Sequence, residues 1–299
     1  MNKKKTQLRK HRPTAEQWRF MLIFGLPPLL LFTFFTVVPM IQAAYTSLFD
    51  YSGYGDMTWV GLDNYRTILT DSVFHQAVIN DVLILIFKTI IVLVLSVLFA
   101  VSITRLRFKK AETNFLRFIY YLPNILSVVV IAKVWKYFFD LELFSVVSGL
   151  ETPENGWVGT YPLPIITFVA SWCGVGAFMI ILIAAINNIP KERYEAAELD
   201  GAGQFRQLFN ITLPAVLPQI RYIAITIITS LVPSNMNFVK LFIGEAESSG
   251  FMVMGLYEYN NAFTYYKLGY ANAAAVLLMF IVLILSYTLN YGITRKERQ

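Results

Sequence analysis

Residues 82–103 read VLILIFKTIIVLVLSVLFAVSI, an apolar run in which Lys88 is the only charged side chain. A helix needs roughly 20 mostly apolar residues to cross the hydrocarbon core of a bilayer. Because lipid offers no hydrogen-bond partner to backbone N–H and C=O groups, a run of this length folds as a helix that satisfies its own backbone. The stretch therefore predicts a membrane-spanning helix.

Five further stretches of the chain have the same character. Prolines interrupt some of them, which membrane helices tolerate when neighbouring groups bond to the freed carbonyls. We expect kinks at Pro27, Pro28, Pro39 and Pro233. The expected fold is all-α, with six transmembrane helices. These run approximately over residues 20–47, 78–104, 115–139, 163–187, 218–243 and 271–293.

The composition agrees with a protein whose solvent is lipid. Of the 299 residues, 56% are hydrophobic and 15% are charged, which is too apolar for a soluble domain of this length. The net charge of +6 does not indicate nucleic acid, because the basic residues stand in short stretches between apolar runs. Cys173 is the only cysteine, so the sequence supports neither a disulfide framework nor a thiolate metal cluster.

The charges between the apolar runs predict the orientation of the chain. Lys and Arg accumulate on the cytoplasmic side of membrane proteins. Here they gather before residue 13, at 105–110 and after residue 294, whereas the alternate connections are rich in Asp and Glu. Both termini are therefore expected in the cytoplasm, which requires an even number of spans. Residues 1–19 are predicted to be a basic cytoplasmic tail, and 20–299 a transmembrane domain.

The sequence shows no motif for nucleotide binding or covalent chemistry. It has no G-x-x-x-x-G-K-[ST] loop, and His11 and His75 are too far apart for a metal-spaced pair. No connection between spans exceeds about 30 residues, which leaves no room for a nucleotide-binding domain. We expect no enzyme activity, no metal and no cofactor in this chain.

The connection at 189–218 reads IPKERYEAAELDGAGQFRQLFNITLPAVLP. Pro190 suits a first helical turn, and residues 191–199 are rich in helix formers. The following Asp-Gly-Ala-Gly breaks the helix, because a glycine such as Gly201 can take the left-handed conformation that ends many helices. The pattern predicts two short helices around a tight turn.

This connection resembles the EAA loop of the permease subunits of ATP-binding-cassette (ABC) importers. The matching residues are Glu195, Ala196, Ala197, Gly201, Ile211, Leu213 and Pro214. In that family the loop forms coupling helices that sit in a groove of a separate ATPase. The resemblance therefore implies ATPase contacts for these residues and for Asp200. The alternative, that Glu-Ala-Ala-Glu is only a helix-forming string, does not account for the register of the glycine and the Ile-x-Leu-Pro.

Further stretches resemble the six-span, maltose-type permeases of carbohydrate importers. They are WVGLDNY at 59–65, YYLP at 120–123, YNNAF at 259–263 and LGYA at 268–271. One departure is FIGEA at 242–246, where many relatives carry Thr-x-Gly-Gly-Pro. The resemblance implies a type I importer fold, with a permease core at about 75–293 and a coupling loop at 188–217. It also implies a second permease subunit, ATPase subunits that bind ATP and Mg²⁺, an extracytoplasmic substrate-binding protein and a sugar as partners.

Polar groups at membrane depth are costly, so each is a candidate for the substrate path. Lys88 lies seven residues beyond Asp81, about two turns or roughly 10 Å along the same helical face. Two hypotheses stay open for Lys88. It lines the translocation cavity, or it extends outward toward Asp81 or a lipid headgroup.

Four more residues are candidates for contact with a sugar: Asn124, Trp172, Asn235 and Asn237. Amide groups can donate to and accept from hydroxyls, and aromatic faces pack on sugar rings. The alternative for the asparagines is hydrogen bonding between helices. Trp135, with Lys133 and Lys136 beside it, is interpreted as an interfacial anchor with lysines that extend to the headgroups.

Together these features predict the permease subunit of an ATP-driven sugar or oligosaccharide importer in a bacterial or archaeal plasma membrane. Two alternatives stay open. One is an importer permease for another solute, such as a glycerophosphodiester or a polyamine. The other is a secondary transporter, which should show internal repeats and paired acids within its spans. The sequence leaves open which sugar is carried, which ATPase is used, and whether the permease pairs with itself or with a different subunit.

Overall fold

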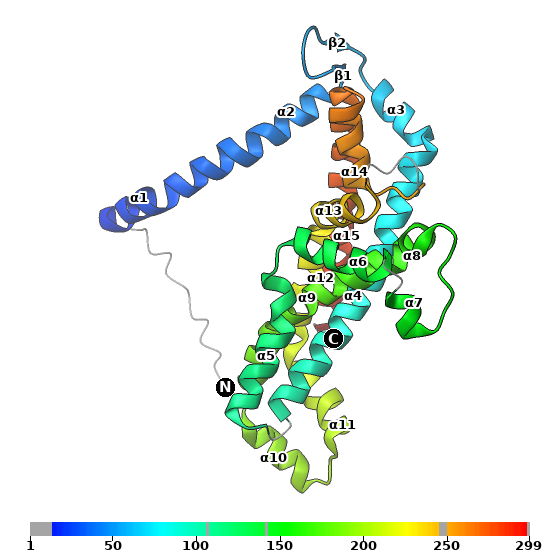
Figure 1. Ribbon diagram of the computed structural model, residues 1–299. Helices are drawn as coiled ribbons and strands as arrows, with labels where there is room; N and C mark the ends of the chain where they lie inside the picture. Colours follow the sequence, from blue (N-terminus) through cyan, green and yellow to red (C-terminus); the bar gives the residue numbers. More distant parts are fainter. Residues whose placement is uncertain (1–13, 106–107, 141–142, 245–249, 298–299) are drawn as a thin grey trace.

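The structure is a computed structural model that describes residues 14–105, 108–140, 143–244 and 250–297. Within these ranges the chain is helical, apart from its connections and one short hairpin of two strands (Figure 1). The basic residues 1–13, Arg107, and part of the departure from the permease pattern, Glu245 and Ala246, lie outside the described residues.

The described residues contain five helices long and apolar enough to cross a membrane, or six spans if one bent helix pair counts as a single span. The bent pair is α5 (Lys110–Ile125) and α6 (Val128–Asp140), which meet at 96°. The predicted all-α fold with six spans is confirmed in this form. The five unbent spans are Trp18–Thr46, Ser72–Arg105, Pro162–Asn187, Gln204–Thr229 and Leu268–Thr288.

The first span, called the arm below, consists of α1 (Ala15–Phe32), the π-helical segment η1 (Thr33–Val37) and α2 (Val38–Thr46). Helix α1 continues through Pro27 and Pro28 without a break. Before Pro39 the helix widens, and the Val38 N–H bonds to the Thr33 carbonyl, five residues back. Because proline has no N–H, the carbonyl four residues before it lacks its usual donor, and a π turn accommodates this.

The third predicted span, 115–139, is not one helix. Helix α5 ends at Ile125, and Leu126 has an extended backbone with ψ of 144°. Ser127 then starts α6, because its Oγ accepts a hydrogen bond from the Val129 N–H at 3.4 Å, as helix-capping serines do. The apolar pattern is continuous across this point, so hydropathy alone did not show the bend.

The fifth predicted span, 218–243, is also divided. Helix α12 (Leu213–Thr229) ends before Ser230, and α13 (Leu231–Ile243) follows it. The kink expected at Pro233 is thus a complete break, since the missing proline N–H leaves the Thr229 carbonyl without its helical donor. The apolar span instead includes the preceding turns, α11 (Gln204–Gln207) and the π-helical η2 (Leu208–Thr212).

Helices α4 (Ser72–Arg105) and α9 (Pro162–Asn187) lie side by side in the centre of the body (Figure 1). Helix α5 approaches α9 so closely that a Cβ atom built on Gly176 would overlap the Tyr120 carbonyl. Small residues permit such close approach between membrane helices. Helix α12 packs on α4 and α9, and α15 (Leu268–Glu297) packs on α12.

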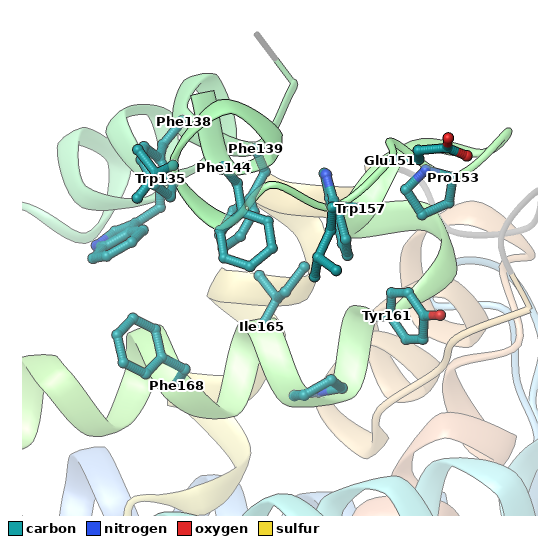
Figure 2. Close-up of a pocket in the computed structure, with 13 residues that line it drawn as sticks. Trp135, Phe138, Phe139, Phe144, Glu151, Pro153, Trp157, Tyr161, Ile165 and Phe168 are labelled. Carbon is teal, nitrogen blue, oxygen red and sulfur yellow. The ribbon is translucent and has the colours of Figure 1, made fainter. Parts of the chain in front are cut away.

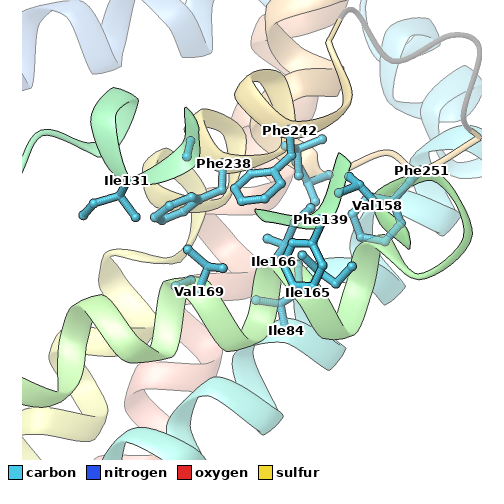
Figure 3. Close-up of a cluster of buried hydrophobic side chains, with 14 of the residues drawn as sticks. Ile84, Ile131, Phe139, Val158, Ile165, Ile166, Val169, Phe238, Phe242 and Phe251 are labelled. Carbon is cyan, nitrogen blue, oxygen red and sulfur yellow. The ribbon is translucent and has the colours of Figure 1, made fainter. Parts of the chain in front are cut away.

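A cluster of buried apolar side chains joins α9 to α6 and α13. Figure 3 shows Phe238 and Phe242 of α13 above Ile166 and Val169 of α9. Lipid tails are as apolar as these side chains, so van der Waals packing holds such contacts together in a bilayer. The cluster fixes α13 against the body. The remaining short helices are α7 (Leu143–Ser148), α8 (Gly156–Thr160), α14 (Met254–Tyr259) and the π-helical η3 (Asn260–Thr264).

The arm projects away from the body (Figure 1), and none of its most apolar window is buried. At its end, Thr46 Oγ1 accepts a hydrogen bond from Asn272 Nδ2 at 2.6 Å. A hairpin of β1 (Phe49–Asp50) and β2 (Thr58–Trp59) follows, and then α3 (Asp63–Thr70). Asn64, from the WVGLDNY stretch, donates to the Ser47 and Phe49 carbonyls at 2.8 and 3.0 Å. This stretch therefore ties the arm to the body.

Candidate functional site

The connection 189–218 folds into the two short helices predicted for it, α10 (Lys191–Leu199) and α11. Gly201 has a φ of +77°. The Ala202 N–H bonds to the Ala197 carbonyl at 2.8 Å, and the Gly201 N–H bonds to the Glu198 carbonyl at 3.0 Å. This pair of bonds is the Schellman motif, which needs a left-handed residue where glycine stands. The expectation for Gly201 is confirmed.

The α10–α11 loop, residues 189–214, lies at the end of the molecule opposite the β-hairpin and α3 (Figure 1). Glu195, Ala196, Asp200 and Gly201 are exposed on it, and Ala197 is half-buried. These predicted residues lie within one short hinge, so the structure brings them together.

Large apolar side chains on the same loop are also exposed, and the sequence analysis missed them. Leu199 is 91% exposed, Phe205 81% and Phe209 62%. An apolar patch on a polar loop marks a contact surface. The sequence did contain a signal for this exposure, because Leu199 comes just before the Asp200-Gly201 turn and Phe205 comes shortly after it.

The last predicted residues of the loop have a different environment. Ile211 packs on the buried cluster of α4, α9 and α12, and Leu213 is half-buried at the start of α12. Pro214 is exposed. Ile211 therefore anchors the loop to the membrane helices.

Four residues outside the predicted set hold the loop together. Tyr194 and Thr212, both buried, share a hydrogen bond of 2.9 Å between their hydroxyl groups. Arg105, the last residue of α4, places its guanidinium carbon 3.8 Å from the centre of the Tyr194 ring. Its Nη2 also donates to Oε1 of Gln207, which is 5% exposed. The end of α4 thus contacts both helices of the loop, α10 through Tyr194 and α11 through Gln207.

Among the candidates at membrane depth, Asn235 belongs to a buried polar network. Its Nδ2 donates to Asp81 Oδ1 at 2.7 Å, and the Met254 N–H donates to Asp81 Oδ2 at 2.8 Å. Asn80, beside Asp81, donates to the Met252 carbonyl at 2.8 Å. These bonds join α4 to α13 and to the segment around α14. For Asn235 they agree with the alternative of hydrogen bonding between helices. Asn237 is exposed on α13.

Lys88 and Asn124 meet around Cys173, where α4, α5 and α9 come together. Lys88 is 7% exposed and lies near Cys173, and Asn124 Nδ2 donates to the Cys173 carbonyl at 3.4 Å. Trp172 is 39% exposed, and its ring centre lies 5.5 Å from that of Trp135. The structure therefore distributes the five path candidates over four places.

Lys136 has partners within the protein that the anchor interpretation did not include. Its Nζ donates to the Phe242 carbonyl at 2.9 Å and pairs with Asp140 at 3.2 Å, so its ammonium group binds to protein groups. Trp135 lines a cavity of about 850 Å³ between α6, α7, α8 and α9. Figure 2 shows Phe144, Trp157 and Phe168 around the same space. This aromatic cavity could not be found from separated sequence segments.

At the opposite end from the α10–α11 loop, Asp71 precedes α4. Its carboxylate accepts hydrogen bonds from Tyr257 Oη at 2.6 Å, Tyr270 Oη at 3.3 Å and the Val73 N–H at 2.8 Å. Burial raises the pKa of the Asp71 carboxyl, but these hydrogen bonds and one from the Phe74 N–H outweigh it and the net direction is downward. Asp71 lies on a polar hollow of about 560 Å³ whose lining includes Asp50, Asp63, Asn261 and Lys267.

Comparisons with known proteins place this architecture. The family model for the inner membrane component of binding-protein-dependent transport systems matches residues 93–298. The chain is similar to MsmF, the multiple sugar-binding transport system permease protein of Streptococcus mutans, with 31% identity over 90% of this chain and 92% of the relative. It is also similar to NgcF, the diacetylchitobiose uptake system permease protein of Streptomyces coelicolor, with 29% identity over 92% of this chain and 82% of the relative.

Among solved structures, the chain resembles one from a bacterial alginate ABC transporter in complex with its alginate pentasaccharide-bound periplasmic protein. The TM-score is 0.80 at 21% identity, over 94% of this chain and 95% of the other. This likeness shows the fold. Since the family model covers more than half of the chain and MsmF is similar over almost all of it, this protein belongs to the family of inner membrane components of binding-protein-dependent transport systems.

Proposed function

We propose that the chain is the non-catalytic permease subunit of an ATP-driven importer for a sugar or oligosaccharide. The observation that carries this proposal is the α10–α11 loop, a glycine-terminated hinge that exposes Glu195 and Ala196 together with Leu199 and Phe205. The relatives MsmF and NgcF, permease proteins of sugar transport systems by name, support the substrate class. Membership of the family argues against a self-sufficient secondary transporter.

The loop has the chemistry of a docking element for a separate ATPase. Ala196 and Ala197 permit close approach of a partner surface, and the Glu195 carboxylate can orient it through a charge-assisted hydrogen bond. Leu199 and Phe205 add apolar area, worth about 1.5–3 kcal/mol for each side chain that becomes fully buried. ATP and Mg²⁺ bind to the ATPase, and Ile211 and Leu213 pass its movement to the core.

The charge pattern supports an orientation in which the loop and both termini lie in the cytoplasm. Residues 1–19 then form a cytoplasmic tail, 20–299 form the transmembrane domain, and the membrane is a bacterial or archaeal plasma membrane. The hollow beside Asp71 faces outward, toward the substrate-binding protein. Most of the arm is exposed, which makes it available to a second permease subunit.

The sugar passes near the groups of this chain that can bond to hydroxyls. Lys88 and Asn124, beside Cys173, and the exposed Asn237 are candidate contacts, and Trp172 offers an aromatic face. Asn235 has the supporting role of joining α13 to α4 through Asp81.

The proposal is tested in proteoliposomes that contain this chain, its second permease subunit and the ATPase, with the binding protein outside. Ala196→Arg puts a long charged side chain where a partner must approach closely. We expect the ATPase to be lost on purification, and ATP-dependent uptake to fall about a hundredfold, the effect of losing a central interface contact.

The matched control is Ala111→Arg, at an exposed position on α5 outside the loop, which should keep uptake near the unmodified level. Normal uptake by Ala196→Arg would contradict the proposal. A panel of sugars, polyamines and glycerophosphodiesters offered to the binding protein separates a sugar importer from the alternative for another solute.

A further inference from the structure

Arg105 stands at the junction between the longest helix of the body and the α10–α11 loop. It ends α4, and its guanidinium both covers the Tyr194 ring and donates to Gln207. Gln207 in turn connects Arg105 to the turn of the loop, because its Nε2 donates to the Ala202 carbonyl at 2.9 Å, directly after Gly201. One side chain of α4 therefore contacts α10 and α11 and, through Gln207, the turn between them.

The loop that Arg105 contacts is a closed unit. Tyr194 on α10 bonds to Thr212 at the end of η2, and Thr212 Oγ1 lies 3.5 Å from the Gln207 carbonyl. Tyr194, Gln207 and Thr212 are at most 7% exposed. Because buried polar groups are costly to leave unpaired, these bonds favour movement of the loop as one piece. A force on its exposed face then reaches Arg105.

Helix α4 can carry that displacement through the membrane. It has 34 residues, so it is about 50 Å long at 1.5 Å per residue. It bears Lys88 near its middle and Asp81 closer to its other end, where Asp81 bonds to Asn235 and to the Met254 N–H. A shift of α4 at Arg105 thus moves the elements that carry the path candidates.

We propose that Arg105 is the positioning residue through which the α10–α11 loop moves α4 during transport. The inference rests on the proposed function and names its mechanical link. Arginine suits the role because a planar guanidinium can stack on a ring while its edge donates a hydrogen bond, whereas the ammonium group of lysine is a point charge without a flat face. Arg105 touches neither sugar nor nucleotide in this role. It sets how much loop movement reaches the spans.

The test uses the complete transporter in proteoliposomes and measures sugar uptake and ATP hydrolysis together. In Arg105→Ala the exposed residues of the loop are unchanged, so the ATPase should still co-purify and still hydrolyse ATP. Uptake should fall, and the ATP hydrolysed per sugar should rise about tenfold, a typical size for coupling between two sites. Gln207→Ala should show the same rise.

Two comparisons distinguish a role of Arg105 in coupling from a role in stabilising the fold alone. The double variant Arg105→Ala with Gln207→Ala should be no worse than either single change, because the two side chains act as one unit. Arg105→Lys should keep the charge and recover only part of the coupling. The matched control is Lys110→Ala, an exposed cation at the start of α5, with an unchanged ATP-to-sugar ratio.

An unchanged ATP-to-sugar ratio in Arg105→Ala overturns the inference, whether uptake and hydrolysis both stay normal or both fall in parallel. The Ala196→Arg variant shows which proposal has failed. If it abolishes uptake while Arg105→Ala transports normally, the function stands and only the Arg105 link is wrong. If Ala196→Arg also transports normally, the proposed function is wrong.

Discussion

The arm and α9 are both apolar helices long enough to cross a bilayer, yet their surroundings differ completely. Half of the most apolar window of α9 is buried inside the protein, and none of that of the arm is buried. Helix α9 carries Ser171, Gly174 and Gly176 among its apolar residues, whereas Thr33–Val37 of the arm holds bulky Phe34 and Phe35. Hydropathy assigns a helix to the membrane, whereas a close helix contact such as that at Gly176 requires a small residue.

The strongest way to break this comparison is to fill the space between α5 and α9. Gly176→Leu drives a side chain into the Tyr120 carbonyl. Since backbone cannot move aside cheaply, we expect a destabilisation of about 3 kcal/mol, at the upper end for overpacked sites. It should appear as a lower thermal midpoint and less monodisperse protein in detergent.

The control for this change lies in the arm. A Cβ atom on Gly25 meets nothing within 4 Å, so Gly25→Leu should leave the thermal midpoint of the chain nearly unchanged. Equal effects of the two substitutions would show that the close contact at Gly176 does not hold α5 on α9.

A smaller effect should follow from the buried polar network of α4. Asp81→Ala removes the acceptor of Asn235 Nδ2 and of the Met254 N–H. A buried donor left without a partner costs about 1–3 kcal/mol, so α13 and α14 should loosen from α4. Hydrogen exchange at the α14 amides measures this. Gln42→Ala, at an exposed position of the arm, serves as the control, and unchanged protection in Asp81→Ala would contradict the assignment.

The smallest effect tests the hydrogen bonds that the Asp71 carboxylate accepts at the start of α4. Because the pKa of Asp71 is held below its usual value, the charged carboxylate is favoured in the folded protein. Its contribution to stability is complete above the ordinary aspartate pKa of about 4 and is lost as the pH falls through the lowered value. Thermal midpoints of the unmodified chain and of Asp71→Asn, measured from pH 7 to pH 3, should converge at the acid end. A constant difference would show that Asp71 does not titrate in this way.

Some of the site could be read from the sequence because its causes are local. Gly201 ends α10 through backbone conformation alone, and the helix formers before it and the apolar turns after it set the ends of the loop. The exposure of Leu199 and Phe205 was accessible in principle, because both flank the turn. The roles of Asn235 and Lys136 were not, since each depends on a partner in another helix.

The sequence by itself determined that this chain is an all-α membrane protein with six apolar stretches and a glycine hinge, because span length and backbone conformation depend on neighbouring residues. Only the tertiary structure decided which stretches bend, which one stands apart as the arm, and which distant groups meet. Arg105 and Gln207 are 102 positions apart, and Asp81 and Asn235 are 154 apart. Lipid tails are as apolar as the side chains of the helices. The apolar pattern of a helix therefore does not predict which other helix packs against it. Packing shape and buried hydrogen bonds make that choice.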